Sequence, residues 1–159
     1  MSIKVRVEGW SPVEPIEAFR RLADYERYPE QTPSVRSVQT ERRGEDLVSI
    51  WRVDFRGGIL CWTERDFIDE AALRLDFEQI DGDLELFAGG WQVLGEVGPE
   101  DVEGSLMIFT AELDLGIPSL APLVDPIAES ALRANMTAVL TGLFDDVVIA
   151  EPSLSRARS

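Results

Sequence analysis

The sequence predicts an α+β domain in which a curved, antiparallel sheet of seven strands wraps around one long C-terminal helix. Three observations indicate this fold class. Residues 3–7 alternate between apolar and polar, six further strand-like segments follow between residues 34 and 115, and residues 120–149 return to helical spacing. Short turns separate the six segments, so they can form an antiparallel meander but leave no room for the crossovers of a parallel sheet.

Two short helices are expected between the first strand and the meander. Ser11 and Pro12 predict the start of a helix, because serine caps helices and proline suits their first turn. The apolar stripe of this helix consists of Ile16, Phe19, Leu22 and Ala23. Pro29 and Pro33 then limit residues 25–33 to a short second helix or a loop.

The six later strands are bounded by turn signals. We expect them at residues 34–43, 47–55, 59–69, 72–80, 84–97 and 105–115. Gly57-Gly58 and Asp81-Gly82-Asp83 mark hairpin turns. Gly89-Gly90 lies inside a strand and predicts a bulge or a sharp bend.

A broad apolar face over residues 120–149 predicts the long helix. Its regular part is expected to begin near Asp125, because Pro122 and Pro126 lie close to its start. We expect residues 1–149 to form a single domain. Residues 150–159 show no packing pattern and are expected to be a disordered tail.

The composition limits the classes of function. The chain of 159 residues has 30 acidic and 15 basic residues, and this excess of negative charge disfavours nucleic acids and anionic membranes as partners. It has no histidine and one cysteine, so we expect no histidine-based catalysis, disulfide or metal site. The N-terminus lacks an apolar signal region. We expect a cytoplasmic protein that needs no cofactor and binds a neutral or hydrophobic small molecule.

The segment RGGILCWTERDF, residues 56–67, places a charged side chain on an otherwise apolar strand face. Side chains alternate along a strand, so one face carries Ile59, Cys61, Thr63, Arg65 and Phe67. We expect this face to point inward. The opposite face carries Glu64 and Asp66, and a paired-carboxylate acid–base site is therefore not expected.

The order of elements and several short motifs together resemble a known superfamily. The motifs are Tyr28-Pro29-Glu30, Trp62-Thr63-Glu64-Arg65, Phe87 through Trp91, and Arg133-Ala134-Asn135-Met136 on the last helix. With them the chain resembles the START-like (SRPBCC) superfamily of helix-grip proteins over residues 3–148. Within that superfamily it is most similar to the polyketide cyclase/dehydrase group, which includes the aromatase/cyclases of bacterial type II polyketide synthases.

The resemblance implies a hydrophobic ligand held between the curved sheet and the long helix. In the aromatase/cyclases this ligand is a poly-β-ketone chain tethered to an acyl carrier protein, which implies such a partner here. Arg65, Thr63 and Asn135 match the groups that orient the chain, and Arg65 would stabilise negative charge on an oxygen during aldol cyclisation. The expected ligand-binding residues are Cys61, Phe67, Trp91, Met107, Phe109, Leu113, Ala131 and Val35.

Several alternatives stay open from the sequence. Arg65 could instead pair with a carboxylate, and Asn135 could bond to the sheet backbone. The whole protein could be a non-catalytic carrier of a quinone, lipid or polyketide, as a monomer or a homodimer. Val35 also departs from the aromatase group, which often has a tyrosine in this segment, and this departure predicts weaker aromatisation than in members with the tyrosine.

Overall fold

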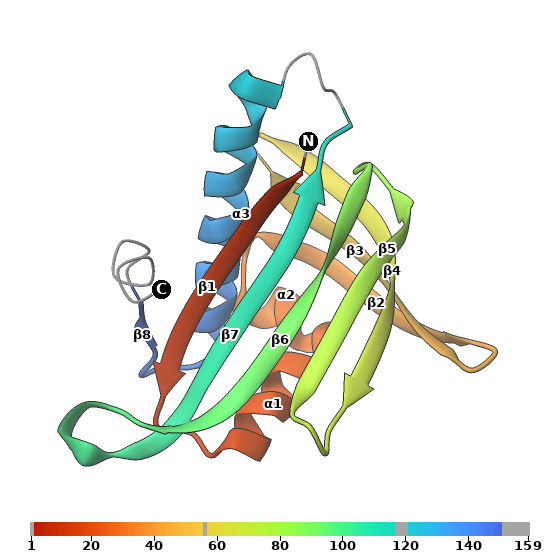
Figure 1. Ribbon diagram of the computed structural model, residues 1–159. Coiled ribbons are helices and arrows are strands. Elements are labelled where there is room, and N and C mark those ends of the chain that lie inside the picture. Colours follow the sequence, from red (N-terminus) through yellow and green to blue (C-terminus); the bar gives the residue numbers. More distant parts are fainter. Residues whose placement is uncertain (1, 56, 117–120, 151–159) are drawn as a thin grey trace.

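In the computed structural model, one antiparallel sheet curves around the long C-terminal helix α3 (Ala121–Leu143), which lies along its concave side (Figure 1). The structure describes residues 2–55, 57–116 and 121–150, with side chains in the last segment from residue 125 onward. The predicted tail at 151–159 lies outside the described residues. Within the described residues, no helix is both long and apolar enough to cross a membrane.

The sheet contains eight strands in the order β2-β3-β4-β5-β6-β7-β1-β8. Their bounds are β1 (Ile3–Ser11), β2 (Val35–Arg43), β3 (Asp46–Phe55), β4 (Gly58–Asp69), β5 (Arg74–Gly82), β6 (Leu86–Val97), β7 (Glu103–Asp114) and β8 (Val148–Ile149). The shorter helices are α1 (Pro15–Ala23), the 3-10 helix η1 (Tyr25–Arg27), α2 (Tyr28–Gln31) and the 3-10 helix η2 (Pro99–Asp101). The predicted fold class is confirmed, and β8 is the additional strand.

Three local predictions differ from the structure. Helix α1 begins at Pro15, because Ser11 still pairs with Ser105 in the sheet. The strand β8 has only two residues, too few to show an alternating pattern, and it pairs with β1. The helix α3 begins at Ala121 and contains Pro126 in its interior, several residues before the predicted start near Asp125.

The glycine pair in β6 permits close strand approach without a bulge. The register between β5, β6 and β7 is regular through Gly89 and Gly90. A Cβ atom on Gly89 would lie 2.1 Å from the carbonyl oxygen of Thr110, and one on Gly90 would lie 2.3 Å from that of Leu75. The register shift of this part of the sheet lies instead between β4 and β5, after Thr63.

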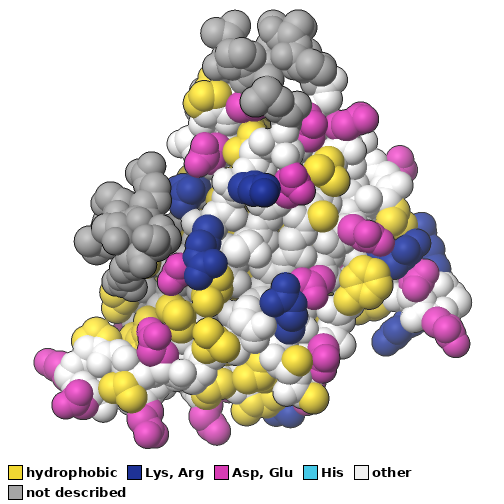
Figure 2. Space-filling model, viewed as in Figure 1, with side chains coloured by type: hydrophobic (Ala, Val, Ile, Leu, Met, Phe, Trp, Pro, Cys, Tyr) yellow, Lys and Arg dark blue, Asp and Glu magenta, His cyan; other side chains and the backbone are white. Residues whose placement is uncertain are grey.

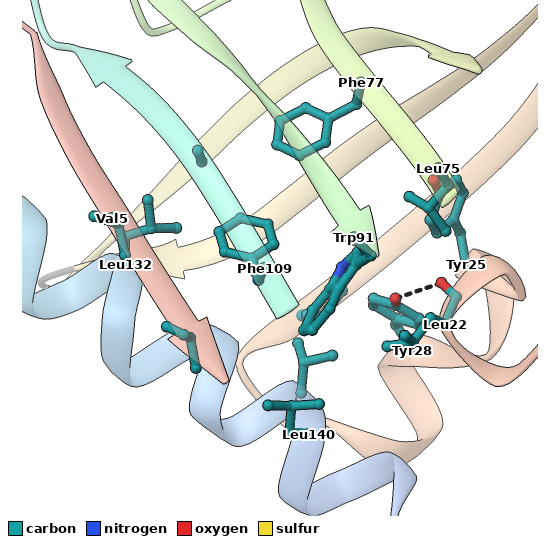
Figure 3. Close-up of a cluster of buried hydrophobic side chains, with 14 of the residues drawn as sticks. Val5, Leu22, Tyr25, Tyr28, Leu75, Phe77, Trp91, Phe109, Leu132 and Leu140 are labelled. Carbon is teal, nitrogen blue, oxygen red and sulfur yellow. Dashed lines mark hydrogen bonds between the residues drawn. The ribbon is translucent and has the colours of Figure 1, made fainter. Parts of the chain in front are cut away.

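The core fills the space between the concave face of the sheet and the helices. Figure 3 shows apolar side chains from β1, β5, β6 and β7 facing Leu132 and Leu140 of α3. The segments η1 and α2 close one end of this space, where the hydroxyl of Tyr28 donates a 2.6 Å hydrogen bond to the carbonyl oxygen of Leu22. Both α3 and these short helices face the concave surface of the sheet. A ligand site inside the protein must therefore lie between that surface and the helices.

Candidate functional site

The inner face of β4 is the one opposite to the face predicted from the sequence. Trp62, Glu64 and Asp66 are buried, with 9%, 3% and 5% of their surface exposed, whereas Phe67 is 49% exposed. The predicted inward set of Ile59, Cys61, Thr63, Arg65 and Phe67 therefore lies on the outer face, and that prediction is wrong. The structure also places the two carboxylates together inside, where none were expected.

Arg65 is held outside the sheet by two acidic residues. Its guanidinium lies 3.4 Å from a carboxylate oxygen of Asp46 and donates a 3.2 Å hydrogen bond to Glu78, its cross-strand partner on β5. The alternative of an ion-paired arginine is therefore the one found in the structure. Figure 2 shows acidic and basic side chains interspersed on the face in view, which is the pattern of a solvated surface.

We expect Arg65→Ala to have a small effect. Partly exposed ion pairs of this kind contribute about 0.2–1 kcal/mol each, because water already screens the charges. The free energy of unfolding measured in urea should fall by no more than about 2 kcal/mol for the two pairs together, and ligand affinity should not change. A loss of ligand binding in a variant that remains folded would contradict the outward position of Arg65.

An internal cavity lies between the concave sheet face and α3. Apolar and aromatic side chains from η1, α2, the sheet and α3 line nearly all of it, and the polar exceptions are Glu64 and Asn135 together with the polar tips of Tyr25, Tyr28 and three tryptophans. The volume open to the centres of water molecules is about 70 Å³. That space holds several waters and is smaller than the roughly 300–1,000 Å³ of common small-molecule sites.

A continuous run of aromatic rings forms one wall of the cavity. Trp51 of β3 stacks on Trp62 of β4 with ring centroids 5.6 Å apart and the planes inclined by 3°. Tyr25 and Tyr28 meet Trp51 in T-shaped geometry, as Phe87 of β6 meets Trp62. Side chains of this kind give the cavity a large apolar surface, which suits an apolar, aromatic ligand.

The polar end of the cavity is built on β3 and β4. Trp62 Nε1 donates a 2.7 Å hydrogen bond to Glu64 Oε1, and Ser49 Oγ donates a 2.6 Å bond to Asp66 Oδ2. Ser49 in turn accepts a 2.8 Å bond from Trp51 Nε1. Since Glu64 and Asp66 are two residues apart on one strand, both side chains point to the same side of the sheet. We refer to Glu64 and Asp66 as the carboxyl pair.

Burial keeps the carboxyl pair partly protonated. Burial raises the pKa of Glu64 well above its ordinary value, and the neighbouring Asp66 raises it further. Burial also raises the pKa of Asp66, but contacts with Glu64 and Ser49 oppose that rise. The pair therefore retains a proton at a pH where exposed carboxyls are ionised, and the contact between the two acids raises the pKa of Glu64 while it lowers that of Asp66.

The remaining predicted site residues divide into three groups. Asn135, Val35, Trp91, Phe109 and Leu113 line the cavity, as their predicted roles require. Met107 is fully buried and Ala131 is half-buried, but neither lines the cavity. Cys61 and Thr63 share the outer face with Arg65 and Phe67, so these four residues have no access to an internal ligand.

The sequence contained a signal for the correct face of β4. Phe55 pairs with Gly58, and counting back from that pair along both strands matches Trp51 with Trp62. Burying two tryptophans removes more apolar surface from water than burying the smaller apolar residues of the other face, so the tryptophan face is favoured as the inner one. The two carboxylates on the tryptophan face hid this signal, because acidic residues are almost never fully buried unless they have partners.

The comparison of the sequence with protein families gives one match that covers most of the chain. The profile of the family described as polyketide cyclase/dehydrase and lipid transport matches residues 11–140. The chain belongs to this family. This assignment confirms the resemblance seen in the sequence, whereas a comparison with curated protein sequences finds no significant match.

Solved structures with the same fold extend over nearly the whole chain. The protein TTHA0849 from Thermus thermophilus is 27% identical, with a TM-score of 0.79 over 89% of this chain and 94% of that one. The Zhui aromatase/cyclase from Streptomyces sp. R1128 is 19% identical, with a TM-score of 0.71 over 90% and 94%. Ginseng major latex-like protein 151 from Panax ginseng is 14% identical, with a TM-score of 0.69 over 89% and 95%. At these identities the last two show a shared fold.

Proposed function

We propose that the protein binds a flat, mostly apolar ketone or polyphenol of the aromatic polyketide class in its cavity and directs aldol cyclisation and dehydration without a cofactor. The observation that carries this proposal is the cavity itself, with stacked aromatic walls and a few polar groups that converge on it. The family description and the similarity to an aromatase/cyclase support it.

Catalysis in such a site depends first on orientation. Two carbon atoms of one ketide chain that are held within reach react as an intramolecular pair, which removes much of the entropic barrier. The aromatic wall of β3, β4 and β6 would hold the chain flat. Asn135 approaches from α3 and can donate to a carbonyl oxygen. The clamp role first expected of Arg65 is not part of this proposal.

The cavity size bears on how a ligand is accommodated. About 70 Å³ is too little for a long ketide chain in the conformation described. A small bicyclic molecule needs less rearrangement, and the unbranched side chain of Met136 at the cavity wall can change rotamer to admit it. We therefore expect compact aromatic ligands to bind before extended ones.

One observation favours a second candidate, a carrier of a hydrophobic ligand. Among the described lining residues there is no lysine or arginine, so the cavity contains no fixed positive charge to stabilise an oxyanion. A minimal polyketide synthase reconstituted with and without the protein separates the two candidates. A changed product profile supports the cyclase, and an unchanged profile together with ligand binding supports the carrier.

An acyl carrier protein as partner remains part of the proposal. Such proteins are acidic, and Arg36, Arg42 and Arg43 on β2 are exposed basic residues that could contact one. Arg36 is paired with Asp54 and Arg43 with Glu41, so their charges are partly neutralised within the protein. We therefore expect a weak, salt-sensitive encounter with the carrier protein.

We expect Met136→Trp to abolish ligand binding. Met136 lines the cavity from α3, and an indole ring there fills the remaining volume. Titration with the polyphenol emodin should quench tryptophan fluorescence with about one site in the wild type, because Trp51, Trp62 and Trp91 line the cavity. The control is Ala134→Trp, an exposed position on the same helix. Equal binding by both variants would contradict an internal site.

A further inference from the structure

Several buried polar atoms near the carboxyl pair have no partner within the protein. They are the Tyr25 hydroxyl, Asp66 Oδ1 and Gln79 Oε1, none of which makes a hydrogen bond of ordinary geometry among the described residues, although Tyr25 and Asp66 are close enough for each to shift the pKa of the other. Tyr25 is only 4% exposed and lines the cavity, and Gln79 lies opposite Glu64 on β5. Buried polar groups are normally satisfied, so such a concentration indicates a place where another molecule supplies the partners.

The unpartnered groups include both a donor and acceptors. The Tyr25 hydroxyl can donate, and Figure 3 shows Tyr25 reaching from the short helices toward the strand that carries Leu75. Asp66 and Gln79 each have an oxygen that can accept, but neither residue lines the cavity. A ketone accepts hydrogen bonds, so it can satisfy the Tyr25 hydroxyl at the cavity wall, whereas a hydrocarbon leaves that hydroxyl unsatisfied.

Within this polar end, Glu64 is the acid that faces the ligand space. It lines the cavity, and its orientation is fixed by the hydrogen bond from Trp62. Asp66, on the same face of β4 as Glu64, accepts a hydrogen bond from Ser49 of β3. The only other titratable side chains facing the pair are Tyr25 and Tyr28 among the described residues, and both have pKa values raised by burial. Neither tyrosine therefore competes for the proton near neutral pH.

We propose that Glu64 is the general acid of the cavity, donating its proton to the carbonyl oxygen of an enolisable ketone, and that Asp66 is a positioning residue that keeps that proton on Glu64. The inference rests on the proposed function. In the step, the Glu64 O–H bond breaks and an O–H bond forms on the ketone oxygen. The α C–H bond breaks, its proton passes to water, and its electron pair forms the C=C bond of the enol. Water then returns a proton to Glu64, so the protein ends unchanged.

This assignment differs from a purely structural role for the pair. A buried carboxyl that served only packing could be replaced by a neutral amide without loss of chemistry, because an amide keeps the same hydrogen bonds. A proton donor cannot be replaced in this way. The variant Glu64→Gln therefore separates the two roles, and Glu78→Gln is the matched control, because Glu78 is a carboxylate on the outer face of the neighbouring strand.

The experiment uses 2-tetralone, a compact bicyclic ketone, with the full-length protein in D2O. Proton NMR follows the replacement of its α-hydrogens by deuterium, and tryptophan fluorescence gives its affinity. The wild type and Glu78→Gln should accelerate exchange, and Glu64→Gln should lose about 100-fold or more of that acceleration while its affinity stays within about threefold. A melting curve for each variant confirms that it is folded.

Asp66→Asn tests the positioning role through pH. Asp66 raises the pKa of Glu64, so neutralising it should move the alkaline limb of the exchange-rate profile to lower pH.

Binding of 2-tetralone with equal exchange in wild type and Glu64→Gln would overturn the inference and leave the proposed function standing. An unshifted profile in Asp66→Asn would overturn the role of Asp66. Failure of 2-tetralone to saturate the wild type would contradict the proposed function, and with it the inference.

Discussion

Trp62→Ala will lower the free energy of unfolding by about 3–5 kcal/mol, the cost of removing a large aromatic side chain from a core. Trp62 is buried, stacks on Trp51, meets Phe87 edge to face and donates a hydrogen bond to Glu64. The truncation removes all of these interactions and leaves a buried carboxyl without its donor. Urea unfolding followed by circular dichroism measures the loss.

Trp62→Phe separates the ring from the hydrogen bond. Phenylalanine retains most of the stacking surface but has no N–H group, and the bond from Trp62 is one of the contacts that favour ionised Glu64. The cost of this variant should therefore increase with pH. A loss below about 1 kcal/mol for Trp62→Ala would show that the tryptophan does not lie inside the protein.

The second large effect is on the pH dependence of stability. Because the pKa of Glu64 is raised in the folded protein, the native state binds more protons than the unfolded chain between the ordinary carboxyl pKa and the raised one. The free energy of unfolding must then fall as pH rises through this interval, by up to about 1.4 kcal/mol per pH unit for each such proton. The stabilisation is complete below the unfolded-state pKa and is lost above the folded-state pKa.

Glu64→Gln should remove most of this dependence, because the amide stays neutral at every pH. Its stability should equal that of the wild type in acid and exceed it increasingly toward alkaline pH. Tyr25 and Tyr28 do not contribute in this range, since their pKa values are raised from an already high value. Glu78→Gln serves again as the control with an unchanged slope. Parallel wild-type and Glu64→Gln curves would contradict a protonated carboxyl pair.

The fold was predictable because its signals are local and repeated. The strands β2 and β3 illustrate this, because their observed ends differ from the predicted ends by no more than one residue. The two-residue strand β8 could not be predicted, because it exists only through its pairing with β1. The start of α3 was predicted too late, because a proline such as Pro126 locally disfavours a helix. In the folded protein the helix nevertheless continues through Pro126, since packing can maintain it.

The candidate site was predictable only in part. Asn135 and Trp91 were assigned correctly to the cavity, because they lie on broad apolar faces with one clear orientation. The tryptophan face of β4 was the correct one, but its two carboxylates argued against it, because the partner that Ser49 of another strand gives Asp66 was not known. Such a partner is visible only after the strands are paired.

The ligand is proposed to occupy the concave side of β4, beside Glu64 and not beside Arg65. Intermolecular nuclear Overhauser effects between 2-tetralone and isotopically labelled protein test it most directly. The structure predicts contacts from the ligand to Trp62, Phe87 and Met136, whose side chains line the cavity. Contacts to Cys61, Thr63 and Phe67 on the outer face, with none to the cavity residues, would contradict it.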